Sequence, residues 1–494
     1  MNKSLFLIGL ILAQASWAQD RQIRNPDVHN QDDRSQQQIR REEEENIRRA
    51  SLQRENLSSA QAPISTRYSD AELVKNPQLL EQHFAQALQN LDKEKLPKLV
   101  KLYKQVPNRD ESLVEWANAI MLTDTNMSQS VAAYRKLAAN FPDNDIIRFQ
   151  LASVLFYNQE YEASKDQFEK LRSSKGVTAN DQKVINRYIE TIDNKDRWNF
   201  SFNGSFLNDP NLGNAAKQGT TMQLPNGSSI TMSSPRQRGT GVGAGISANK
   251  QWSLGGGRHI NLESSLNGKY YWNNKKFNDL NFSTGLGFGY SNPIYGVDVT
   301  PYYAKRLYGG GTSGTSKLKS YTDTFGGSVA ANAWLNPQWK YNFYYDASYT
   351  RYNEEGYAKQ YNGLSQTVSN GVMYFPNPRQ FWSAGVDYTH SGAKSKTNAY
   401  DRVGGRVGWG QEWPLGISSR TSLGYGVRNY KAVDYHGKKE RKEEFTGSLS
   451  LWHKAIHYQG FTPRLTLSYQ STDSNVPISK FDKFQGFVEL NKSF

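Results

Sequence analysis

Two periodicities of apolar and polar residues divide the chain near residue 197. Between residues 71 and 196, apolar residues recur with the period of an amphipathic helix, about 3.6 residues. From Trp198 to the end, apolar and polar residues alternate, as in strands with one apolar face. The pattern predicts a helical domain at 71–196 and a strand-rich domain at 197–494.

Within the helical stretch, two segments repeat at a spacing of 34 residues, since Tyr134 recurs as Phe168. This is the period of the tetratricopeptide repeat (TPR), whose stacked helix pairs form a concave binding surface. The usual Trp and Gly of the first repeat helix are missing, so an unrelated helical bundle stays open. A passive spacer or a plug beneath the pore stays open as the role of this domain. The expected repeat-core residues are Tyr134, Leu137, Pro142, Ala152, Phe168 and Leu171.

Fourteen alternating segments follow Trp198. The clearest spans 339–349, with Trp, Tyr, Phe or Ala at every second position. Long connections such as 208–239 and 309–319 alternate with short, proline-bearing ones, which is the layout of outer-membrane barrels with their turns in the periplasm. An even strand number returns both barrel ends to the periplasm. We therefore expect an α+β multidomain protein, with periplasmic TPR-like helices before a 14-stranded antiparallel transmembrane β-barrel.

The N-terminus has the features of a secretory signal peptide over residues 1–18. Lys3 precedes an apolar run at 5–13, and small residues precede a cleavage site after Ala18. Residues 19–70 are polar and charged, and they predict a flexible arm because they bury too little apolar surface to offset the entropy of ordering. A tether and a partner-binding arm both stay open as its role. These features predict the bacterial outer membrane as the location, with the N-terminal domain in the periplasm.

The positive charge is concentrated in the expected barrel. Residues 197–494 hold 33 Lys+Arg and 18 Asp+Glu, a net +15, against +14 for the whole chain. Charges facing lipid at midplane cost about 2–4 kcal/mol each, so these side chains should point inward. This pattern leaves open a salt-bridged lumen, an anion-preferring pore, a track for polar cargo or ordinary lumen filling. The expected lumen-lining residues are Arg402, Arg406, Arg420, Arg428, Arg464, Glu263, Asp298, Asp346 and Asp387.

Few signs of catalytic chemistry are present. The chain has no cysteine, which excludes thiol nucleophiles and Cys-ligated metals. The seven histidines are scattered, and no nucleophile elbow or phosphate-binding loop occurs. We expect no enzyme, no cofactor, no metal site and no nucleic-acid partner.

The order of domains, together with three local motifs, resembles the surface lipoprotein assembly modulator (Slam) family. The motifs are Pro-Asn-Pro-Arg at 376–379, Tyr-Asp-Arg at 400–402 and Gly-Trp-Gly at 408–410. The resemblance implies that the chain carries a client protein across the outer membrane. The client would be a surface lipoprotein or a related secreted protein that binds haem or a host iron carrier. The repeats would engage the client and the barrel would pass it.

Likeness to outer-membrane barrels in general implies a partner in assembly. Phe494 ends an alternating strand with an aromatic residue, which is the expected signal for the barrel assembly machinery. Periplasmic chaperones and outer-membrane lipid are further expected partners. Two alternative functions stay open: an exopolysaccharide exporter, which also joins helical repeats to a barrel, and a porin-like uptake channel, which leaves the helical domain unexplained.

Overall fold

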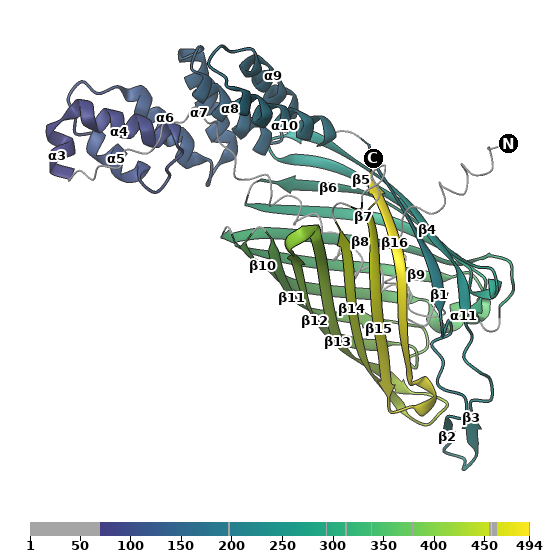
Figure 1. Ribbon diagram of the computed structural model, residues 1–494. Helices are drawn as coiled ribbons and strands as arrows, with labels where there is room; N and C mark the ends of the chain where they lie inside the picture. The colour runs from purple at the N-terminus through teal and green to yellow at the C-terminus, as the bar shows by residue number, and fades with distance from the viewer. Residues whose placement is uncertain are drawn as a thin grey trace, which may run out of the picture.

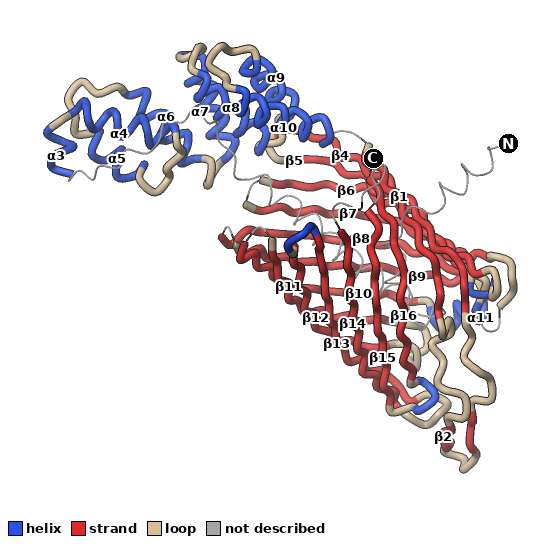
Figure 2. Tube along the Cα trace, in the orientation of Figure 1, coloured by secondary structure: helices blue, strands red, loops and turns tan. Residues whose placement is uncertain are grey.

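The computed structural model places a helical region beside a closed barrel (Figures 1 and 2). The expected signal peptide, residues 19–69 of the arm and Phe494 lie outside the described residues. No helix in the described part of the chain is long and apolar enough to cross a membrane. The structure describes residues 70–195, 198–292, 294–311, 314–336, 338–377, 379–453, 456 and 462–493.

Eight helices follow one another between residues 70 and 195. Asparagine or aspartate side chains cap several of them by accepting backbone N–H bonds, as Asn126 Oδ1 does from Gln129 at 3.1 Å. The helices are α3 (Asp70–Lys75), α4 (Pro77–Gln89), α5 (Leu96–Tyr103), α6 (Glu111–Leu122), α7 (Met127–Asn140), α8 (Asp145–Tyr157), α9 (Tyr161–Arg172) and α10 (Ala179–Lys195).

The 34-residue repeat corresponds to two consecutive helix pairs, α6–α7 and α8–α9. In each pair a fully buried serine of the second helix donates to a carbonyl of the first. Ser130 Oγ donates to Ala119 at 2.7 Å, and Ser164 Oγ donates to Ala152 at 2.7 Å. Because the two serines lie 34 residues apart and make the same contact, the helical region is TPR-like, as expected.

The barrel closes from fourteen antiparallel strands, which confirms the expected architecture. Each strand pairs with its sequence neighbours, and β1 pairs with β16 to close the ring. The strands are β1 (Asn199–Asp209), β4 (Gly239–Gly255), β5 (Arg258–Tyr271), β6 (Asp279–Ser291), β7 (Tyr295–Tyr308), β8 (Lys319–Asn336), β9 (Trp339–Tyr352), β10 (Gly363–Asn377), β11 (Gln380–Ser391), β12 (Tyr400–Glu412), β13 (Ile417–Val433), β14 (Lys439–His453), β15 (Thr462–Ser474) and β16 (Phe481–Ser493).

Side chains alternate between the two faces of the barrel wall. On β13, Leu423 and Tyr425 are about half exposed on the outer face, whereas Arg428 in the opposite frame is 2% exposed. Because successive strand residues point to opposite faces, this places apolar groups outside and polar groups inside. A closed barrel with an apolar outer face suits an outer membrane, since lipid can satisfy no backbone hydrogen bond.

Two connections contain structure that the alternation did not predict. The long connection after β1 holds a hairpin, β2 (Thr221–Gln223) with β3 (Ser229–Thr231). Asn226-Gly227 between them is a turn signal that was present in the sequence. The connection after β9 holds helix α11 (Glu355–Tyr361), with an i,i+4 ion pair between Glu355 and Lys359 at 2.7 Å.

Candidate functional site

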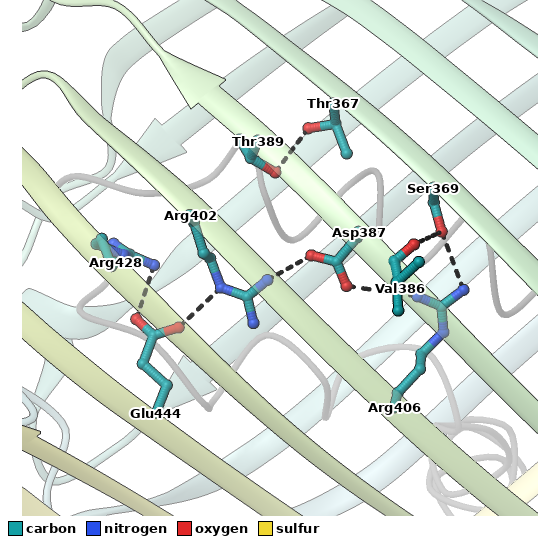
Figure 3. A network of polar contacts seen from close by, with 9 residues as sticks. All are labelled: Thr367, Ser369, Val386, Asp387, Thr389, Arg402, Arg406, Arg428 and Glu444. Carbon is teal, nitrogen blue, oxygen red and sulfur yellow. Dashed lines mark hydrogen bonds and ion pairs between the residues drawn. The ribbon is translucent and has the colours of Figure 1, made fainter.

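The inner face of β11–β14 carries a cluster that we name the charged wall: Asp387, Arg402, Arg406, Arg428 and Glu444 (Figure 3). Strand register places its charges in rows. One row across β11, β12, β13 and β14 reads Thr389, Arg402, Arg428 and Lys442. Like charges directly opposite one another destabilise a sheet, so this row needs carboxylates close by.

The next row supplies those carboxylates at its two ends. It reads Asp387, Gly404, Gly426 and Glu444. Arg402 ion-pairs with Asp387 through Nη1 and donates from Nε to Glu444 Oε2 at 2.9 Å. Each carboxylate therefore contacts a guanidinium of the cationic row.

Each of these carboxylates also binds a second arginine. Glu444 Oε1 lies 2.9 Å from Nη2 of Arg428, and Asp387 Oδ1 lies 3.5 Å from Nη1 of Arg406. Arg406 Nη2 also donates to Ser369 Oγ on β10 at 3.1 Å. The contacts thus form one chain of ion pairs and hydrogen bonds across five strands.

The two glycines of the acidic row make room for Arg402. A Cβ at Gly404 would lie 2.6 Å from Arg402 Nη1, and a Cβ at Gly426 would lie 2.6 Å from Arg402 Nη2. The guanidinium therefore lies against bare backbone between its two carboxylates. A close approach of this kind requires glycine at both positions.

The remaining expected lumen-lining residues also lie on the inner frame, and several have defined partners. Asp298 contacts His259 at 2.7 Å, and Asp346 accepts from Tyr302 at 2.8 Å. Arg464 stacks on Trp452, with the guanidinium carbon 4.4 Å from the ring centroid. The guanidinium carbon of Arg420 lies 5.9 Å from the ring centroid of Phe381. Glu263 is half-buried on β5.

The charged wall restricts what its arginines can do. Asp387 is 4% exposed and Arg428 2% exposed, so both are largely removed from water. Buried charges are tolerated only when they are paired and hydrogen-bonded, and removing one partner costs about 3–5 kcal/mol. The geometry therefore favours a cross-linked, salt-bridged wall over a row of arginines available to bind anions. No group of three possible metal ligands occurs among the residues that the structure describes.

Sequence reasoning did not identify Glu444, the acid that bridges two arginines. The alternation of β14 was sufficient to place it on the inner face, next to the outward Phe445. Sequence reasoning also missed two other buried ion pairs, which lie near the ends of the strands beside the loops. Arg306 contacts Asp279 at 2.8 Å, and Lys483 contacts Asp209 at 3.2 Å.

The expected repeat-core residues lie inside the helical region, apart from Pro142, which is exposed in the loop after α7. Gln150 of α8 connects this interior. Its Oε1 accepts from Trp116 Nε1 at 2.6 Å and from the Tyr134 hydroxyl at 3.1 Å, and its Nε2 donates to the Leu88 carbonyl at 3.1 Å. Burial raises the pKa of Tyr134, so its hydroxyl stays protonated as a donor. In the described part of the helical region, the large hydrophobic residue that is exposed is Phe141, directly after α7.

The helical region docks on the barrel through the turn between α8 and α9. The Asn158 carbonyl accepts from the Gly257 N–H at 2.8 Å, and Gln159 Nε2 donates to the Ser291 carbonyl at 3.2 Å. Ser253 Oγ donates to the Gln159 carbonyl. We name these contacts the joint. It fastens the repeats to the β4–β5 turn and to the end of β6, on the rim where the chain enters β1 (Figure 1).

Comparison with known proteins supports the two-part architecture. A family described as "Surface lipoprotein assembly modifier" matches residues 198–494, and its N-terminal TPR repeats match residues 66–168. Among solved structures, the P. putida toluene transporter TodX has a TM-score of 0.33 at 11% identity, covering 60% of this chain and 90% of that one. A likeness of that size supports no conclusion about function.

Two curated relatives come from Haemophilus influenzae. "Surface lipoprotein assembly modifier 1" is 36% identical over 87% of this chain and 88% of its own length. "Surface lipoprotein assembly modifier 2" is 34% identical over 99% of this chain and 98% of its own length. These matches cover both the helices and the barrel, and the chain belongs to the surface lipoprotein assembly modifier family.

Proposed function

We propose that this protein is an outer-membrane translocator that delivers a client lipoprotein to the cell surface. Membership of the family, together with the outer-membrane barrel fold, supports a role in exposing lipoproteins at the surface and not a catalytic one. In the finer proposal, the helical region receives the client in the periplasm and the barrel passes it outward. A client that binds haem or an iron carrier is an expectation from the family resemblance alone.

The joint is the observation that carries this proposal. Its hydrogen bonds attach the TPR-like helices to the periplasmic rim of the barrel. A client bound to the helices is therefore held at the periplasmic entrance of the barrel. Helical repeats commonly bind a partner on their concave face. Because the one exposed large hydrophobic residue in the described part of the helical region is Phe141, directly after α7, we expect client contacts that are mainly polar.

The test begins with removal of the gene. Lipoproteins are labelled with an alkyne-bearing palmitate, and those removed from intact cells by added protease are compared between wild type and deletion strain. We expect at least one labelled lipoprotein to lose its protease sensitivity in the deletion strain. Unchanged shaving of every labelled lipoprotein would contradict the proposal. Loss of polysaccharide export alone would support the exporter, and loss of small-solute uptake alone the channel.

A second variant tests the helical region. Deletion of residues 70–195 should leave the barrel inserted but reduce lipoprotein exposure, because the client is no longer held at the rim. Gln159→Ala weakens the joint without removing the repeats and should reduce exposure less. Gln167→Ala is the matched control, because Gln167 bonds Arg148 within the helical region at 3.0 Å and does not contact the barrel in any contact that the structure gives. Normal export without residues 70–195 would reduce the repeats to a spacer.

A further inference from the structure

The interface between β1 and β16, which we name the seam, is paired over only part of its length. Cα partners run from Ser201 with Ser493 to Ser205 with Glu489. Continuing this register would set residues 206–209 opposite 485–488. Among the described residues, no strand pairing joins these two stretches, although β1 is paired with β4 up to Asp209 and β16 with β15 up to Phe481.

The unpaired part lies in the half of the barrel away from the helical region. Strand β1 leaves the helices at Asn199 and ends at Asp209, next to the loop with β2 and β3 (Figure 1). With the helices in the periplasm, this half is level with the outer leaflet. Backbone groups left unpaired in hydrocarbon cost several kcal/mol each, so an edge open at this depth needs water or another polar group beside it.

Buried polar atoms without hydrogen-bond partners lie on the inner face of β1, β16 and the neighbouring β15. They are the Asn203 Oδ1 and Ser205 Oγ of β1, the Gln470 Oε1 of β15 and the Gln485 Nε2 of β16. Each of these residues is at least nine-tenths buried. Gln485 lies in the unpaired stretch of β16 and Ser205 is the last paired residue of β1, whereas Asn203 lies within the paired part. Buried polar atoms are normally satisfied, so the atoms of Gln485 and Ser205 point to polar atoms that pass or bind beside the open part.

Side chains, and not backbone, hold the open part together. Lys483 and Asp209 form a buried ion pair across the seam at 3.2 Å. Nearer the loops, Arg236 donates to the Asp482 carbonyl at 3.1 Å. On the outer face, Phe206 and Val488 are each 51% exposed beside the opening. Contacts of this kind can separate without breaking the backbone hydrogen bonds between strands.

We propose that the unpaired part of the seam is a lateral exit through which the acyl chains of a client's lipid anchor move from the lumen into the outer leaflet. The inference rests on the proposed function. A protein whose anchor ends in the outer leaflet cannot leave a closed barrel only through its end, because the anchor must cross the wall. The opening lies at the required depth, with polar atoms inside and apolar side chains outside.

The test locks the seam reversibly. The chain has no native cysteine, so an Asp209→Cys, Lys483→Cys double variant can be bridged with a cleavable bis-methanethiosulfonate. The matched control, Asn208→Cys with Thr240→Cys, bridges β1 to its fully paired neighbour β4 at the same end. The readout is the protease shaving of palmitate-labelled lipoproteins that are absent from the surface of the deletion strain. We expect the seam bridge to abolish shaving, reduction to restore it, and the control bridge to leave it unchanged.

Two further measurements keep the outcomes distinct. If the first pair fails to insert, Leu207→Cys with Phe487→Cys locks the same stretch and leaves the ion pair in place. A photoreactive residue at Val488 should form adducts with the labelled lipoprotein, whereas one at Val407, 53% exposed on β12, should not. Normal shaving with a bridged seam would overturn the lateral exit but leave the proposed function standing. A third photoreactive residue replaces Gln485, which faces the lumen. If it forms adducts only with polypeptide that carries no palmitate label, the lateral exit is also overturned, in favour of a peptide strand that adds to the open edge.

Discussion

The charged wall and the seam are two parts of one barrel held together in different ways. Between β12 and β13, strand pairing is continuous from Tyr400 to Glu412, and arginines of neighbouring strands share carboxylates. In the seam, pairing stops after Ser205, and one buried ion pair spans the unpaired part. The wall therefore resists separation through backbone and side chains together, whereas the seam resists it at one end mainly through side chains.

This difference indicates where the barrel can change shape at least cost. Opening the wall between β12 and β13 would break the hydrogen bonds of the strand ladder and also separate the buried Arg402–Glu444 ion pair, which is costly in a low-dielectric environment. Opening the outer part of the seam breaks one buried ion pair and the partly exposed contacts of Arg236 and Lys217 with Asp482. A translocator needs a wall that keeps its shape while one interface yields, and the two regions supply these two properties.

The largest expected effect comes from removing the carboxylate that two wall arginines share. Asp387→Ala leaves Arg402 with one carboxylate and Arg406 with its serine contact, so we expect a loss of about 3–5 kcal/mol in the free energy of unfolding. Urea unfolding in lipid vesicles, followed by tryptophan fluorescence, measures it. Asp323→Ala is the control, since the Lys305–Asp323 pair is partly exposed and should be worth at most about 1 kcal/mol. Equal losses for the two variants would contradict the distinction.

The second prediction concerns the buried pair of the seam. Lys483→Ala should cost about 2 kcal/mol or more, because it leaves Asp209 buried without its cation. The loss should be smaller than for Asp387→Ala, since Asp209 still accepts the Asn211 N–H at 2.8 Å. The double variant Asp209→Ala, Lys483→Ala should be more stable than Lys483→Ala alone, because no unpaired buried charge remains. A double variant less stable than both single variants would show that the pair itself holds the barrel closed.

Hydrogen exchange separates the seam from the wall in the same variants. Loss of Lys483 should speed amide exchange in residues 206–209 and 485–488 and leave β12 and β13 protected, because the wall does not depend on this pair. Loss of Asp387 should speed exchange in β11 and β12 instead. Exchange that rises uniformly around the barrel in either variant would mean that the two regions unfold as one unit.

Much of the barrel was predictable from sequence because a strand has a period of two. Alternation located all fourteen strands and assigned each residue to a face, so Arg402 and Asp387 could be placed on the same side. The partner of each charge was not predictable in this way. Whether Arg402 contacts Glu444 depends on the register of β13 against both neighbours, and no local pattern fixes that offset.

The extent of the seam was less predictable still. Its pairing joins the first and last strands of the barrel, from Ser201 with Ser493 to Ser205 with Glu489, and it depends on how the strands stagger when the ring closes. In the helical region the 34-residue period carries more information, since the spacing that makes Tyr134 recur as Phe168 also relates Ser130 to Ser164, which make the same contact. The joint at Gln159 had no sequence signal, because it depends on how two folded parts meet.

The fourth prediction tests whether the charged wall needs glycine beside Arg402. Gly404→Ala places a Cβ 2.6 Å from Arg402 Nη1 and 3.0 Å from an Asp387 oxygen, so the guanidinium must move from its carboxylate. We expect a loss of about 1–3 kcal/mol from this overpacking. Gly405→Ala is the adjacent control, because its Cβ would point outward and meet its nearest atom at 3.8 Å. If both variants are equally stable in urea, Arg402 does not need the bare backbone.

The smallest expected effect is at the outer edge of the seam. Arg236 bonds the Asp482 carbonyl and lies 3.3 Å from its carboxylate, which is 46% exposed. Arg236→Gln should therefore cost less than about 1 kcal/mol, since exposed ion pairs are screened by water and salt. The exposed Arg238 gives the control variant, Arg238→Gln, with the same change in charge. If Arg236→Gln lowers the free energy of unfolding as much as Lys483→Ala does, the contact that mainly holds the seam closed lies in the loop and not in the buried ion pair. Equal behaviour of the two arginine variants leaves Asp209 and Lys483 as the contact that must break for the seam to open.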